Sequence, residues 1–136
     1  MSVALTVVTP EGQAYDETVE AVVLPGVEGS FGVLSGHEVF MTALQTGEME
    51  ISTGSETLYA AVSKGFAEVH EDAVTVMVGT CEFAHEIDLD RAKLAAERAQ
   101  AQLEEMRGTE EGEAHYQEYQ EAYSKAIARV AAAEHK

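Results

Sequence analysis

The chain is poor in cysteine and in basic residues, and each shortage argues against a class of protein. Cys81 is the only cysteine among 136 residues, so one chain cannot build a disulfide framework or a thiolate metal site. Lysine and arginine number 8 against 25 acidic residues, which gives a formal net charge of −17. Such an acidic surface repels phosphate backbones and anionic lipid, which argues against nucleic-acid binding. The charge favours a solvated acidic surface, with a basic protein partner as the functional alternative.

Long apolar runs and targeting signals are also missing. The sequence has no run of about 20 apolar residues, so we expect no direct membrane insertion. The N-terminus, Met1 to Thr6, lacks the basic and apolar segments of a secretory signal and the arginines of a transit peptide. These absences favour a cytoplasmic protein.

The first 85 residues have the pattern of short β-strands. Valine and threonine are frequent there, and turn signals such as Pro10-Glu11-Gly12 and Pro25-Gly26 separate the apolar runs. The spacing of these runs, about 8 to 12 residues, is typical of a small sandwich or barrel rather than of βαβ units. We predict strands at residues 4–9, 17–24, 57–62, 66–70 and 73–78.

The last 50 residues have a helical period and no proline. Asp88 is a good N-cap, Gly108 is a helix stop, and residues 109–112 read as a polar linker. Two apolar stripes at steps of three and four predict an antiparallel helical hairpin, with Ala92, Ala96, Ala99, Leu103 and Met106 on the first helix and Tyr116, Tyr119, Tyr123, Ile127 and Val130 on the second. Because buried alanine contributes little, the hairpin should be marginal alone and should need a docking surface.

These patterns predict an α+β chain with two parts. Residues 1–86 form an N-terminal antiparallel β-sandwich, and residues 87–136 form a C-terminal antiparallel α-helical hairpin. The small apolar residues of the hairpin further indicate a detachable or mobile element.

No motif in the sequence supports catalysis or metal binding. The glycine-rich segment with Gly26, Gly29, Gly32 and Gly36 lacks the Gly-Lys-Ser/Thr of a P-loop, so tight turns between short strands are the better interpretation. The histidines do not have the spacing of a zinc protease, and no Ser/His/Asp arrangement is apparent. Cys81 ends a β-like run, where a buried small side chain is the expected role. We therefore expect a non-catalytic chain without a required cofactor or metal.

Four segments together resemble a known family. They are Val8-Thr9-Pro10-Glu11-Gly12, the glycine-rich stretch from Pro25 to His37, Gly65-Phe66-Ala67-Glu68-Val69, and Ile87-Asp88-x-x-Arg91-Ala92. Their order and separations resemble those of the ε subunit of bacterial-type F-type ATP synthases, over nearly the whole chain. The resemblance implies a β-sandwich that joins the γ subunit to the ring of c subunits, at the cytoplasmic face of the bacterial inner membrane. It also implies a contact loop for the c ring, with Glu28, Ser30, Phe31 and His37.

The resemblance implies two regulatory properties of the hairpin. In bacterial members the helices extend into the α/β catalytic hexamer and block ATP hydrolysis, with the help of bases that correspond here to Lys125 and Arg129. The many glutamates of the last helix lead us to expect modest or absent inhibition. Some members bind regulatory ATP, and the matching positions here are Glu82, Asp88, Arg91 and Arg98. The alternative, which we favour, is that Asp88 is a helix cap and Arg91 a surface base.

A second hypothesis stays open from the sequence alone. The chain could be a stand-alone β-sandwich protein-binding module whose helical hairpin is an oligomerisation arm. Co-purification with a γ subunit would distinguish the two hypotheses.

Overall fold

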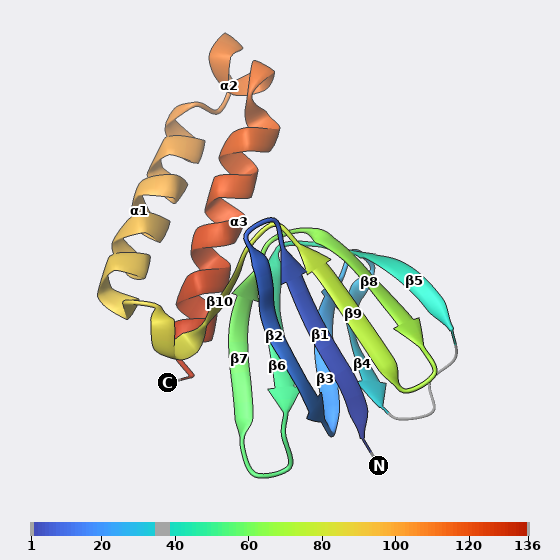
Figure 1. The fold of residues 1–136 in the computed structure, drawn as a ribbon. Helices are drawn as coiled ribbons and strands as arrows, with labels where there is room; N and C mark the ends of the chain where they lie inside the picture. The colour runs from blue at the N-terminus through green and yellow to red at the C-terminus, as the bar shows by residue number, and fades with distance from the viewer. Residues whose placement is uncertain (1, 35–38, 136) are drawn as a thin grey trace.

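A computed structural model describes residues 2–34 and 39–135 of the chain (Figure 1). The described residues form a sandwich of ten strands followed by a pair of long helices. The strands are β1 (Val3–Thr9), β2 (Gly12–Val19), β3 (Ala21–Gly26), β4 (Gly29–Leu34), β5 (Phe40–Leu44), β6 (Gly47–Ser52), β7 (Thr57–Val62), β8 (Gly65–His70), β9 (Ala73–Val78) and β10 (Cys81–Phe83). The helices are η1 (Ala84–Glu86), α1 (Leu89–Glu105), α2 (Glu110–Ala114) and α3 (Tyr116–Ala133).

The strands form two layers that are joined at one corner. One layer has the order β10-β7-β6-β3, with β4 on the far side of β3, and the other has the order β5-β8-β9-β1-β2. A single pair, Gly26 with Leu44, connects β3 to β5 between the layers. All pairs are antiparallel except β1 with β9, which is parallel. The predicted fold class, a β-sandwich followed by a helical hairpin, is confirmed.

The space between the layers holds the main apolar core. Among the described residues, its buried members come from the strands, from Val3 on β1 to Phe83 on β10, and none comes from a helix. Leu5, Leu24 and Ile51 are completely buried there. The described part of the sandwich therefore has a core of its own.

The predicted strand at 17–24 is wrong, because the structure divides it. β2 ends at Val19 and β3 begins at Ala21, so the break falls at Glu20. β2 pairs with β1 in one layer, whereas β3 pairs with β4 and β6 in the other. The chain changes layer at this point, and strand propensity alone does not report such a change.

Pro25-Gly26 does not end β3 as predicted. Both residues belong to the strand, and the hairpin to β4 turns at Val27 and Glu28 instead. Gly29 supplies the left-handed backbone at the turn, with φ of 127°. A Cβ on Gly26 would come 2.7 Å from the Gly29 carbonyl oxygen, so the close approach of the two strands requires glycine there.

The first helix matches its predicted signals, and the linker after it differs. The Asp88 carboxylate accepts the backbone N–H of Arg91 at 3.2 Å at the N-terminus of α1, and Gly108 adopts φ of 78° just after its end. The predicted polar linker contains the short helix α2. The Thr109 hydroxyl caps α2 by accepting the Gly112 N–H at 2.9 Å.

The predicted apolar stripe of the second helix is only partly its buried face, since Val130 packs against a small core beside the helix but other members of the stripe are exposed. Tyr116 and Ile127 are 54% and 44% exposed, whereas the buried residues of α3 are Ala126, Ala128, Ala132 and Ala133. α3 lies between α1 and the outer face of β6 and β7 (Figure 1). Because the helix is covered on two sides, close backbone approach selects alanine over larger side chains. A second small core of Ala61, Ile87, Ala92, Ala128, Ala132 and Ala133 joins the helices to the sandwich.

Candidate functional site

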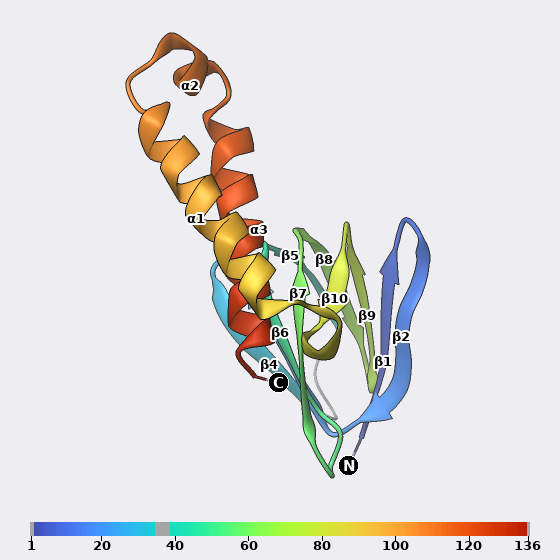
Figure 2. The ribbon, with the colours of Figure 1, turned by 90° about the vertical axis from the view of Figure 1, so that its left-hand side faces the viewer.

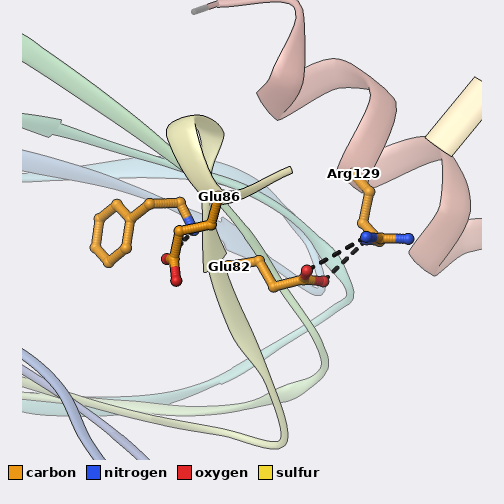
Figure 3. A network of polar contacts seen from close by, with 4 residues as sticks. Glu82, Glu86 and Arg129 are labelled. Carbon is orange, nitrogen blue, oxygen red and sulfur yellow. Dashed lines mark hydrogen bonds and ion pairs between the residues drawn. The ribbon is translucent and has the colours of Figure 1, made fainter. Parts of the chain in front are cut away.

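The clearest polar contact between the two parts is an ion pair between β10 and α3. Arg129 Nε lies 2.9 Å from Glu82 Oε1, and Arg129 Nη2 donates to Glu82 Oε2 at 3.3 Å (Figure 3). The Nε contact is electrostatic, because its N–H is not aligned for a hydrogen bond. Next to it, Glu86 Oε1 accepts the Phe83 N–H at 3.0 Å and fixes the turn that follows β10. Glu82 and Arg129 therefore belong to one site, although the resemblance placed them in two.

The other three residues of the expected nucleotide site do not join this pair in the described chain. Asp88 caps α1, as the structural alternative anticipated. Arg91 and Arg98 are exposed on α1, and among the described residues no hydrogen bond or ion pair joins their side chains to Glu82. The structure thus brings Glu82 to α3 rather than to the bases of α1.

The two bases of α3 lie at the sandwich surface. Lys125 and Arg129 are one helical turn apart and line a pocket of about 180 Å³ between α3 and the sheet. The other lining residues are Ala61, Val62, Ser63, Thr80, Glu82 and Ala128. In this folded arrangement Arg129 pairs with the chain's own sandwich, and exposed Lys125 lines the pocket beside it. The spacing of four residues was the only sequence signal that they share a face.

The expected c-ring loop is a β-hairpin in its described part. Glu28 and Ser30 are exposed at the tip between β3 and β4. Phe31 is half-buried against the main core, with its ring centroid 6.0 Å from that of Phe40. His37 lies outside the described residues. A groove of about 470 Å³ runs beside the tip, between Glu28 and Met41.

An exposed apolar row crosses the outer face of the layer that the helices leave uncovered. The strand register places Ala43, Phe66, Met77 and Val8 side by side on β5, β8, β9 and β1. Phe66 is 54% exposed, Met77 is 38% exposed, and Met41 nearby on β5 is 61% exposed. We name Phe66, Met77, Met41, Ala43 and Val8 the apolar face. Sequence reasoning did not select it, although the alternation of Phe66 and Glu68 with buried Ala67 and Val69 marks an outward side.

Cys81 is half-buried at the start of β10. Burial, with smaller contributions from Glu86 and Glu82, raises the pKa of its thiol to about 12. Within residues 2–34 and 39–135 no group of three metal-ligating side chains is close enough to hold a metal ion. No helix in the same residues is long and apolar enough to cross a membrane.

Comparison with known proteins gives a consistent result over the whole chain. Residues 2–84 match the family described as ATP synthase, Delta/Epsilon chain, beta-sandwich domain, and residues 85–134 match its long alpha-helix domain. ATP synthase epsilon chain 2 of Syntrophotalea carbinolica is 42% identical over 126 residues, which cover 93% of this chain and 89% of that protein. ATP synthase epsilon chain of Staphylococcus haemolyticus is 46% identical over 105 residues, 76% of this chain and 79% of that protein.

A solved assembly contains a similar fold. A chain in the cryo-EM structure of Euglena gracilis mitochondrial ATP synthase, OSCP/F1/c-ring in rotational state 1, superposes with a TM-score of 0.81 at 25% identity. The match covers 96% of this chain and 81% of that one. Both family domains match, and the relatives cover most of the chain, so this chain belongs to the ATP synthase ε-chain family and is a non-catalytic subunit of the F-type ATP synthase.

Proposed function

We propose that this chain forms the foot of the central rotor stalk, with its sandwich bound to γ and to the ring of c subunits. The observation that carries the proposal is the apolar face on the layer opposite the helices. A contiguous exposed apolar surface on a sandwich marks a protein-binding site. The rim of the face is polar, since Glu68 pairs with Met41 and Thr75 across β5, β8 and β9.

The γ contact is tested by substitution on this face. Phe66→Ser removes an exposed aromatic side chain without touching the core, and we expect it to weaken binding to purified γ by about tenfold or more. Leu94→Ser is the matched control, because Leu94 is 51% exposed on α1, away from the face. Binding is measured by titration of labelled γ. Equal affinities for the two variants would overturn the γ assignment of this face.

The tip of the β3–β4 hairpin is the proposed c-ring contact. Glu28 and Ser30 project there beside exposed Val27, so the tip offers a polar and an apolar group to one partner. The hairpin would then place the chain at the membrane surface as a peripheral subunit, on the cytoplasmic side in a bacterium. Glu28→Ala together with Ser30→Ala should reduce binding to detergent-solubilised c ring while γ binding is unchanged.

Inhibition of ATP hydrolysis is a second part of the proposal. For α3 to reach the α/β hexamer, the ion pair between Arg129 and Glu82 must break, and Lys125 must leave the sandwich surface. Glu118 and Glu121 on the same helix carry negative charges, which would weaken the binding of α3 to an acidic target. These features support modest inhibition.

The test is ATP hydrolysis by the cognate α/β/γ complex with no addition, with the full chain, and with a truncation that ends at Glu86. Inhibition by the full chain alone would support a regulatory hairpin. Equal rates of ATP hydrolysis, with both forms eluting with γ, would indicate a coupling subunit whose hairpin does not inhibit hydrolysis. Equal rates without co-elution would overturn the stalk assignment.

Regulatory ATP binding at Glu82, Asp88, Arg91 and Arg98 has less support. Asp88 already accepts a backbone N–H as a cap, and Glu82 already neutralises Arg129. A nucleotide would have to compete with both contacts. Calorimetric titration with ATP up to millimolar concentration should show no binding, and saturable binding lost in Arg98→Ala would restore the nucleotide site.

A further inference from the structure

A row of three residues on the sandwich faces α3. The strand register aligns Glu48 on β6, Ala61 on β7 and Glu82 on β10, all at one level of the sheet. Ala61 is buried in the small core with Ala128 and Ala132 of α3. The row therefore has a carboxylate on each side of the alanine on which the helix rests.

Arg129 meets one of these carboxylates, and the last described residue of the chain meets the other. His135 Nε2 lies 3.4 Å from Glu48 Oε2, at the end of the row opposite Glu82. The imidazole also lies flat on the ring of Tyr59, with centroids 3.7 Å apart and planes 10° from parallel. Tyr59 is itself oriented by a hydrogen bond from its hydroxyl to Glu50 Oε1 at 3.4 Å. The half-exposed imidazole thus contacts two side chains of the sandwich, Glu48 of β6 and Tyr59 of β7.

The backbone holds His135 in this position. Its N–H donates to the Ala132 carbonyl oxygen at 3.1 Å, which continues the turn past the end of α3. Ala132 and Ala133 just before it are 0% and 1% exposed. The pKa of Glu48 is raised, because partial burial of the carboxylate outweighs the opposing effect of His135.

Elsewhere α3 is fixed to the sandwich by the pair of Arg129 with Glu82 and by a hydrogen bond from Thr46 Oγ1 to Glu121 Oε1. The apolar part of the contact consists mainly of alanines, which bury little area each. The first turns of α3 extend beyond the sandwich with α1 and α2 (Figure 2). The apolar contact is therefore made mainly by the C-terminal half of the helix, and His135 adds a large side chain at its end.

We infer that His135 is a C-terminal clasp: its stack on Tyr59 and its contact with Glu48 keep α3 docked on the sandwich. Release of the clasp frees the last turn, which leaves the alanine contact, the pair of Arg129 with Glu82 and the hydrogen bond from Thr46 to Glu121 to hold the helix. The device acts within the isolated chain and does not require any partner subunit.

Hydrogen exchange measured by mass spectrometry on the full chain tests the clasp. His135→Ala should speed exchange in residues 126–135 on the order of fivefold, the effect of losing an aromatic contact, while β1 and β9 keep their protection. Glu134→Ala is the control, because Glu134 is the exposed neighbour and should leave exchange unchanged. Tyr59→Leu removes the same stack from the sandwich side and should reproduce the stacking part of the effect, and the double variant should exchange no faster than His135→Ala.

Three outcomes would overturn the inference. They are unchanged protection in His135→Ala, equal acceleration of the sandwich strands, and additive effects in the double variant. His135→Phe separates the two components, since it keeps a ring for Tyr59 and loses Nε2. Intermediate protection in this variant supports both contacts, and exchange as fast as in His135→Ala would overturn the part assigned to stacking.

The regulatory consequence rests on the proposed function and is measured separately. If α3 must undock to inhibit, His135→Ala should inhibit ATP hydrolysis by the α/β/γ complex more strongly than the wild-type chain. Faster exchange without stronger inhibition would count against inhibition by α3 and would still support the role of His135 as a clasp. Stronger inhibition with unchanged exchange would overturn the inference about His135 and would still support inhibition by the hairpin.

Discussion

At the scale of single residues, Gly65 shows how one position can fix the packing of two strands. A Cβ at Gly65 would lie 1.9 Å from the Met77 carbonyl oxygen and 2.8 Å from Val78 Cα, both backbone atoms of β9. No side-chain rotation can relieve this clash. The glycine therefore permits the pairing that sets Phe66 beside Met77 on the apolar face.

Gly65→Ala should destabilise the sandwich by about 3 kcal/mol or more, because the backbone of β8 or β9 must shift. Gly32→Ala is the matched control, since Gly32 is also in a strand and its Cβ would meet no atom within 4 Å. Urea unfolding followed by circular dichroism measures both. If Gly65→Ala lowers the free energy of unfolding no more than Gly32→Ala does, the two strands can move apart at this point at little cost.

The thiol of Cys81 gives a prediction with a defined direction in pH. Its pKa of about 12 is raised first by burial, so the folded chain holds the protonated form far above the usual range of a thiol. Near pH 8 the native thiol should react with a disulfide reagent on the order of a thousandfold more slowly than the unfolded one. Reaction is followed by absorbance with and without denaturant, and Cys81→Ser is the blank. Similar reaction rates for the native and the unfolded chain would show that the thiol is exposed to solvent in the folded state.

At the scale of elements, α3 is defined by what covers it rather than by its own hydrophobicity. Ala132 is fully buried in the small core, between α1 and β7. Ala132→Leu should destabilise the docked hairpin by about 2 kcal/mol, because three extra carbons have no space there. Ala122→Leu, at an exposed position of the same helix, should change stability by less than about 0.5 kcal/mol.

Thermal unfolding at a helix-sensitive wavelength compares the two leucine variants, and hydrogen exchange shows where the loss occurs. We expect faster exchange in α1 and α3 of Ala132→Leu, with β1 and β9 unaffected. A stable Ala132→Leu hairpin would mean that α3 can shift outward without cost.

The elements also show which parts of the structure sequence reasoning could reach. α1 was predictable from end to end, because Asp88 and Gly108 act through local backbone chemistry. The break at Glu20 was not, since it depends on which layer each strand joins. The buried face of α3 was missed because periodicity weights large side chains, whereas a helix covered on two sides selects small ones. The pair of Glu82 with Arg129 spans 47 positions, so only the fold brings it together.

At the scale of the whole molecule, the two cores predict that the sandwich can fold without the helical hairpin, whereas the hairpin cannot fold without the sandwich. The main core contains only strand residues, up to Phe83, while the small core needs Ala61 of the sandwich to complete the helical side. α1 and α3 have 17 and 18 residues, close to the length at which isolated helices are marginal in water. Their mutual contact rests on alanine and a few half-buried larger side chains.

A chain that ends at Glu86 should therefore unfold cooperatively, with a midpoint modestly below that of the full chain, because it loses only the small core. A peptide of residues 87–136 should show little helix, since its docking surface is gone. Circular dichroism and calorimetry on the two fragments and on the full chain test this directly. A fragment 1–86 that melts without a cooperative transition would show that sandwich and helices form one folding unit. A detachable hairpin would then be excluded, because α3 could not leave the sheet without unfolding the part that holds the apolar face.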